Sequence, residues 1–241
     1  MGTGDPGFLD HLIDRHIALL DIRRKLGEES RAGEPTTSSP EQGPWVTISK
    51  ELGSGGEEIA RQVAERLGWH VFDREILEAI AHNTQTRERL LSRLDERAVG
   101  RLDEFFANLL MPRVPSQSAF LNDMMQMIWT LGRDGYAVLL GRGANWILEA
   151  RYGLRVRLTA PVGVRVDRIA CAGSLSQVEA QKRVHEDDAR RAGFIRQVYG
   201  RDIADPLGYD LTLNTTSLGT ATCARFILAA LEVKLGVTPG A

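Results

Sequence analysis

Four consecutive residues of the 241-residue chain, Gly53-Ser54-Gly55-Gly56, have the composition of a phosphate-binding turn. They follow the β-rich run 45–49 and precede an amphipathic helical pattern from Glu57 to Leu67. A bound phosphate needs several backbone N–H groups directed at one point, and glycines permit that close approach and the unusual backbone angles. The N-terminus of the following helix adds a favourable dipole. An ordinary strand-to-helix turn is the alternative, but this position between strand and helix favours phosphate binding.

Charged residues also follow two other predicted strands. Asp73 and Arg74 come directly after residues 69–72, and Arg142, flanked by glycines, comes directly after residues 136–140. Parallel strands expose their ligand-binding edge at their C-terminal ends. An arginine there can bind a phosphate through two hydrogen bonds. The alternative, a surface arginine in a loop, is less favoured for Arg142 because of where the strand ends.

A third group of charges lies near the C-terminal part of the chain. Residues 179–192 alternate basic and acidic side chains, and most of them are expected to form the solvated face of a helix. Arg201 and Asp205 differ because they stand outside a clear helical pattern, in an Arg-Asp-x-x-Asp spacing. Arginines that close over a phosphoryl group in transfer stabilise its spread negative charge.

The elements that would position these groups alternate between strand and helix. Strands are expected at 45–49, 69–72, 136–140, 154–158 and 209–214, with helices at 57–67, 162–172, 176–192 and 221–235 and a largely helical stretch at 74–134 that is broken at Pro112 and Pro115. This order predicts an α/β fold with a parallel sheet. Asn214, at the end of the last strand, could contact a ligand, but a role in capping a turn is preferred.

The N-terminal region is predicted to be an extension of the main domain. Residues 8–26 have helical periodicity, Gly27 is a plausible stop, and residues 28–44 have a linker composition. The boundaries are therefore 1–27 for the helix, 28–44 for the linker and 45–238 for the domain. Packing of the helix on its own domain is slightly favoured over self-association or docking through residues 8–26.

Composition narrows the possible partners. The net charge of −2 argues against a dominant nucleic-acid or membrane-binding surface. Cys171 and Cys223 lack the spacing of a metal site, and no run of about eighteen apolar residues occurs. We expect a soluble, cytoplasmic protein without a nucleic-acid or membrane partner.

Four segments, taken in order, give a more specific expectation: VTISKELGSGGEEIARQVAERLGWHVFD, LLGRGANWIL, RVRLTAPVGVRVDRI and YGRDIADPLGYDLTLNT. Together they resemble the cytidylate kinases, particularly their cytidylate-kinase-like branch, over about residues 45–236. The resemblance implies a three-layer P-loop NTPase fold with a central parallel sheet. It also implies a helical acceptor-binding insertion at 74–134 and a lid at 173–206, to which this chain adds the N-terminal helix.

The activity implied by the resemblance is transfer of the γ-phosphoryl group of ATP, with Mg²⁺, to a nucleoside monophosphate. CMP and dCMP are the first candidates for this acceptor. The implied residues are, for the donor phosphates, Gly53, Ser54, Gly55, Gly56, Glu57 and Glu58; for the acceptor, Asp73, Arg74, Arg142 and Asp205; for the transferring charge, Arg142 and Arg201; and for Mg²⁺, Glu57, directly or through water.

Two departures from this pattern bear on catalysis. A full P-loop ends in Gly-Lys-Ser/Thr, but here Gly56 takes the lysine position and Glu57 follows it. Lys50, at the place of the first glycine of the loop, could supply a substitute cation. Leu140 stands where cytidylate kinases carry an acidic residue. Two alternatives therefore stay open, namely a nucleotide-binding regulatory module with little or no turnover and a kinase of another small acceptor.

Overall fold

The computed structural model describes residues 6–30, 42–109 and 119–238. Five parallel strands form one sheet in the order β2-β3-β1-β4-β5. Their bounds are Trp45–Lys50 for β1, His70–Phe72 for β2, Ala137–Leu140 for β3, Gly153–Thr159 for β4 and Leu211–Asn214 for β5. The predicted parallel sheet is confirmed, and its C-terminal edge gathers the ends of β1, β2 and β3.

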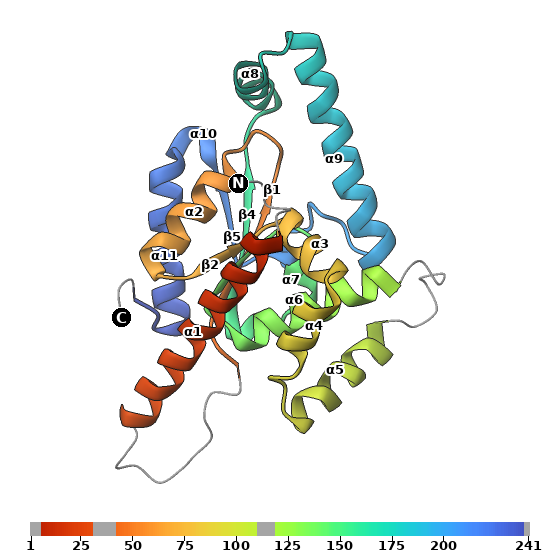
Figure 1. The fold of residues 1–241 in the computed structure, drawn as a ribbon. Coiled ribbons are helices and arrows are strands. Elements are labelled where there is room, and N and C mark those ends of the chain that lie inside the picture. The colour runs from red at the N-terminus through yellow and green to blue at the C-terminus, as the bar shows by residue number, and fades with distance from the viewer. Residues whose placement is uncertain (1–5, 31–41, 110–118, 239–241) are drawn as a thin grey trace.

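Helices cover both faces of the sheet (Figure 1). Alternate strand residues such as Val46 and Ile48 pack with α2 (Gly56–Leu67) and α11 (Thr220–Leu235) in one buried cluster. Trp45 and Leu139 face the other way and pack with the helices that follow β2. Because strand side chains alternate between faces, this pattern produces the three-layer P-loop fold that the sequence predicts.

The segment between β2 and β3 is helical, as predicted. It contains α3 (Arg74–His82), α4 (Thr84–Leu91), α5 (Glu96–Leu109) and α6 (Ala119–Asp134). The predicted break at Pro112 and Pro115 lies outside the described residues.

The chain after β3 forms the remaining helices. Short helices are α7 (Ala144–Ile147) and α10 (Thr215–Leu218), with 3₁₀ turns at Ala150–Tyr152 and Pro206–Gly208. The two helices α8 (Val162–Gly173) and α9 (Gln177–Tyr199) extend above the sheet, and α9 descends along one side of the molecule (Figure 1). Helix α9 runs beyond the predicted end at residue 192 and stops at Gly200, which adopts φ 64°.

The N-terminal helix α1 (Pro6–Ser30) packs on its own domain. Leu9 and Ile13 are buried in the same cluster as α3, α4 and α6. Ion pairs from α4 and the residues after it add to this contact, including Arg93 to Asp21 at 3.1 Å. The stop predicted at Gly27 is wrong, since the helix continues to Ser30. A glycine inside a helix is tolerated at a modest cost when its neighbours favour helix.

Since the apolar side of α1 is already covered, self-association through this helix would have to use its opposite side. Of the predicted linker, residues 31–41 lie outside the described part of the chain. No described helix is both long enough and apolar enough to cross a membrane.

Candidate functional site

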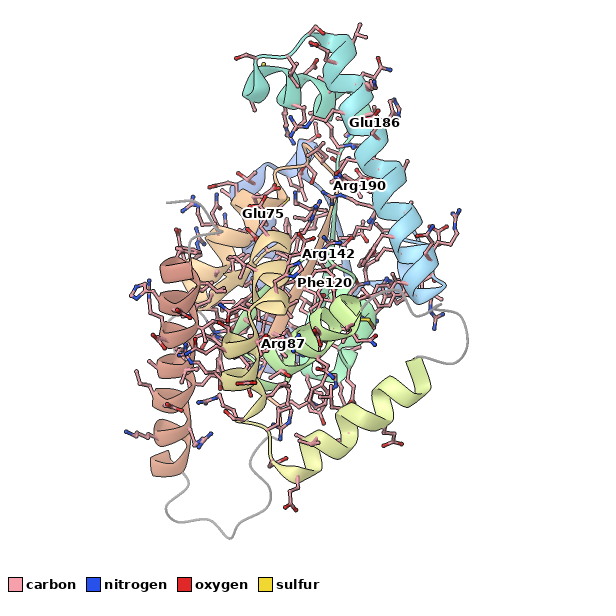
Figure 2. The ribbon with its side chains drawn as sticks, turned by 45° about the vertical axis from the view of Figure 1, so that its right-hand side comes forward. Glu75, Arg87, Phe120, Arg142, Glu186 and Arg190 are labelled. Carbon is pink, nitrogen blue, oxygen red and sulfur yellow. The ribbon has the colours of Figure 1, made fainter. Side chains whose placement is uncertain are left out.

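A cavity of about 490 Å³ opens at the C-terminal edge of the sheet, between α3 and α9. Its lining carries six lysines or arginines and four carboxylates. In Figure 2, Glu75 on α3 and Arg190 on α9 lie on opposite sides, with Arg142 below them. The lining residues are Ser49, Lys50, Leu52, Glu57, Asp73, Arg74, Glu75, Leu140, Gly141, Arg142, Gly143, Asn145, Arg183, Asp187, Arg190, Arg191, Phe194, Ile195 and Ile203.

The glycine turn connects β1 to α2 at one end of this cavity. Gly53 and Gly55 both adopt φ 79°, a conformation that side chains other than glycine rarely tolerate. Ser54 is fully buried, and its hydroxyl donates to the Glu51 carbonyl at 2.7 Å. The N–H groups of Gly53, Gly55 and Gly56 have no acceptor among the described residues. Three free donors next to the N-terminus of α2 are what an anion requires.

The side chain of Lys50 passes over Gly56, the position at which a full P-loop carries its lysine. A Cβ at Gly56 would lie 2.6 Å from Cβ and Cδ of Lys50, so the lysine stem lies directly over Gly56. The ammonium Nζ pairs with the Glu57 carboxylate at the start of α2. The side chain of Lys50 is 11% exposed. The Lys50 side chain can therefore take this course because residue 56 is a glycine, which has no Cβ.

Glu57 enters the cavity beside this lysine. Burial acts to raise the pKa of its carboxyl, but the charge and hydrogen bond of Lys50, a backbone hydrogen bond and the charge of Arg191 together hold that pKa below the usual value. Glu57 is accordingly ionised at neutral pH and presents an oxygen ligand of the kind that Mg²⁺ prefers. Within the turn itself, Gly53, Ser54, Gly55 and Gly56 do not line the cavity, although Lys50 and Glu57 do.

Arg142 is held at the end of β3 by an unusual backbone. Gly141, Arg142 and Gly143 adopt φ 87°, 53° and 70° in succession. For a residue other than glycine this conformation costs energy and is concentrated at functional sites. The Tyr199 hydroxyl donates to the Arg142 carbonyl at 2.8 Å, and a Cβ at Gly143 would meet the Tyr199 ring at 2.3 Å. The backbone of Arg142 is therefore fixed by α9.

The Arg142 guanidinium lies 5.3 Å from the centre of the Phe194 ring and pairs with Glu78 of α3. Burial, and then the nearby Arg74 guanidinium, lowers the pKa of Arg142 to about 10, so it stays charged at neutral pH. Arg74 donates to Glu78 at 3.1 Å. Two guanidiniums thus share one carboxylate, which leaves donors for an incoming anion.

Asp73 also lines the cavity, but its carboxylate has a structural contact that the sequence interpretation did not include. It caps α3 by accepting from the Ile76 N–H at 2.9 Å. The predicted contact of Asp73 with the acceptor nucleotide would have to use the carboxylate lone pairs that do not accept from Ile76.

One face of α9 supplies most of the remaining charge. Arg183, Asp187, Arg190 and Arg191 all line the cavity. Arg183 and Arg190 are exposed, as expected for a solvated face, whereas Asp187 is buried and Arg191 is only partly exposed. With Phe194 these four residues follow the spacing i, i+4, i+7, i+8 and i+11, which places them on one side of a helix. That periodicity was available in the sequence, but the intervening charges concealed it.

The residues predicted from the Arg-Asp-x-x-Asp spacing lie outside the cavity lining. Arg201 stacks over Trp146 at 5.6 Å, and Asp205 caps the turn at Pro206 by accepting from the Leu207 N–H at 2.9 Å. Their contacts with a nucleotide stay predictions. Glu58 also lies outside the lining and pairs with Arg61 at 2.7 Å.

The preference for a capping role at Asn214 is confirmed, because its side chain accepts from the Thr216 N–H at 3.0 Å.

Comparisons with known proteins show the family to which the chain belongs. A sequence model described as the cytidylate kinase-like family matches residues 45–217. The chain is 27% identical to a cytidylate kinase of Pyrococcus horikoshii over 190 residues, covering 78% of this chain and 88% of that protein. It is 31% identical to a cytidylate kinase of Natronomonas pharaonis over 174 residues, covering 72% and 81%.

Among solved structures, an uncharacterized protein from Eubacterium ventriosum has a similar fold. The TM-score is 0.65 at 18% identity, with coverage of 80% of this chain and 99% of that one. The family match covers the glycine turn, Arg142 and the whole of α8 and α9. The chain therefore belongs to the cytidylate kinase-like family, a family of nucleotide kinases, which are phosphotransferases.

Proposed function

We propose that this protein transfers the γ-phosphoryl group of ATP to a nucleoside monophosphate, with CMP or dCMP as the first candidate acceptor. The observation that carries the proposal is the course of Lys50 over Gly56. It brings the ammonium of Lys50, whose side chain is 11% exposed, to the glycine turn, where a kinase of this fold needs a cation. We also propose that it acts in the cytoplasm, where its nucleotide substrates and Mg²⁺ are available.

The donor site fits ATP with Mg²⁺. The free N–H groups of the turn and the N-terminus of α2 suit the phosphates, and Glu57 would hold the metal together with phosphate oxygens and water. Bound in this way, Mg²⁺ neutralises charge on the donor phosphates. Lys50 would then exchange its contact with Glu57 for a phosphate oxygen.

The acceptor phosphate would lie between α3 and α9. Arg142 and Arg74 would bind it through the donors that Glu78 does not occupy. Arg190 would approach from α9, while Arg191 is engaged with the Lys50 carbonyl, and the pocket walls would exclude water from the transfer. Such positioning and charge stabilisation account for most of the catalysis in phosphoryl transfer.

The Lys50–Glu57 ion pair favours one alternative. If the lysine stays paired when a nucleotide is bound, the chain binds ATP but turns it over slowly, as a regulatory module would.

A coupled assay of ADP release with ATP, Mg²⁺ and a panel of nucleoside monophosphates and small alcohols separates these functions. We expect CMP or dCMP to give the highest kcat/KM. ATP binding by calorimetry without ADP release above background for any acceptor would refute the kinase and leave the module. A higher kcat/KM for a small alcohol would instead indicate another acceptor.

A further inference from the structure

Three arginines from α8 and α9 donate to backbone carbonyls of residues 50–53, the segment that leads from β1 into the glycine turn. Arg191 donates to the Lys50 carbonyl, Arg165 to the Leu52 carbonyl at 3.3 Å and Arg168 to the Gly53 carbonyl at 3.1 Å. The remaining carbonyl of the segment 50–53, that of Glu51, accepts from Ser54. Every carbonyl of this segment is therefore occupied, three of the four by a guanidinium from the two helices above the sheet.

Two of these arginines are themselves held in place by carboxylates of α9. Arg165 is 3% exposed and forms two hydrogen bonds with Asp188 of α9, at 2.9 and 3.1 Å. Arg191 pairs with Asp187 at 2.5 Å, and Asp187 is 7% exposed. A guanidinium fixed by a carboxylate on one side presents its other donors in a defined direction.

The turn also touches α8 directly. A Cβ at Gly53 would lie 2.7 Å from the carbonyl oxygen of Arg165, so the two backbones are in close contact. Across a trans peptide, the carbonyl of one residue and the N–H of the next point in opposite directions. Fixing the Leu52 carbonyl toward Arg165 therefore fixes the direction of the Gly53 N–H, one of the three unpartnered donors.

We propose that Arg165, Arg168 and Arg191 are positioning residues that hold the glycine turn in its phosphate-binding conformation through its carbonyls. The shape of the donor site then depends on α8 and α9 being docked on it. Because this turn lacks its own lysine, its backbone is ordered by side chains of other segments, the arginines of α8 and α9. The ligand named here, the donor phosphates, rests on the proposed function, but the ordering of the turn does not.

Arg191 gives the sharpest test because it is partly exposed, at 25% of its side chain, and its replacement should leave the fold intact. Hydrogen–deuterium exchange of ligand-free Arg191→Gln protein is expected to be faster by at least about 10-fold at residues 51–57, since one charged hydrogen bond is lost. Arg191→Lys should restore part of the protection. Arg196→Ala, on an exposed position of the same helix, is the matched control and should exchange like the wild type.

Calorimetry with ATP and Mg²⁺ completes the experiment. Arg191→Gln is expected to raise the Kd for ATP about 10-fold while the KM for the acceptor changes less than about 2-fold. Weaker ATP binding with unchanged exchange would make Arg191 a direct phosphate ligand only, and would overturn the proposal. If the wild type binds no ATP, the proposed function fails. The exchange experiment still decides the role of the arginines in that case, because faster exchange of Arg191→Gln at residues 51–57 supports it and unchanged exchange overturns it.

Discussion

Acidification from pH 7.5 to 5.0 is expected to destabilise the protein through His16 on α1. Its ring is fully buried, with centroids 5.6 Å from His70 and 5.0 Å from Phe72, and neither ring nitrogen has a hydrogen-bond partner in the described part of the chain. Burial first, then His70 and Arg93, lowers the pKa of His16 to about 3. The folded state therefore requires the neutral ring.

Proton linkage gives the sign and the size of this change in the free energy of unfolding. An unfolded histidine titrates near pH 6.5, so the stabilisation by neutral His16 is complete above that pH and is lost as the pH falls toward 3. At pH 5.0 the unfolded state has bound almost one extra proton at this site, which lowers the free energy of unfolding by about 2 kcal/mol. Asp134, whose pKa burial raises to about 6, acts in the opposite direction, so only a comparison between variants isolates His16.

Urea unfolding followed by tryptophan fluorescence at both pH values measures this effect. His16→Leu is expected to reduce the pH-dependent loss of unfolding free energy by about 2 kcal/mol relative to the wild type. His185→Gln, at an exposed position of α9, is the matched control and should behave like the wild type. Equal pH-dependent losses in His16→Leu and the wild type would refute the assignment to His16.

Three further substitutions test the site and its supporting helix. Gly56→Ala places a Cβ 2.6 Å from the Lys50 stem and should weaken ATP binding about 10-fold in calorimetry; unchanged affinity would mean that Lys50 does not need this path. Arg142→Ala should raise the KM of the acceptor about 10- to 100-fold in steady-state kinetics, whereas an equal rise for ATP would place Arg142 elsewhere. Gly193→Ala, with no atom within 4 Å of the added Cβ, should raise the free energy of urea unfolding by about 0.5–1 kcal/mol, and a loss of stability would contradict the helix-entropy argument.

Local patterns made much of the fold predictable. The run Trp45–Ser49, the glycine turn and the amphipathic helix after it define a βαβ unit, and the parallel sheet follows from its repetition. Arg142 was also predictable, since parallel strands direct the residues at their ends toward one edge.

What the sequence did not reveal depends on contacts between distant segments. Lys50 was a candidate cation, but its passage over Gly56 depends on the backbone angles of the whole turn. The contact of Arg165 with the Leu52 carbonyl joins residues 113 positions apart. The cavity-lining face of α9 was missed because a helix with mixed charges is usually solvated, and only the packing of α9 beside the sheet edge reverses that expectation.

The central claim, that Lys50 replaces the missing lysine of the turn, is tested most directly by single-turnover phosphoryl transfer. Radiolabelled γ-phosphate of ATP is followed into the nucleoside diphosphate with wild type, Lys50→Ala and Lys50→Arg. Lys182→Ala, an exposed lysine of α9, is the control. We expect Lys50→Ala to slow transfer by about 100-fold or more at an unchanged melting temperature, with partial activity in Lys50→Arg. A Lys50→Ala rate within about 2-fold of the wild type would contradict the claim.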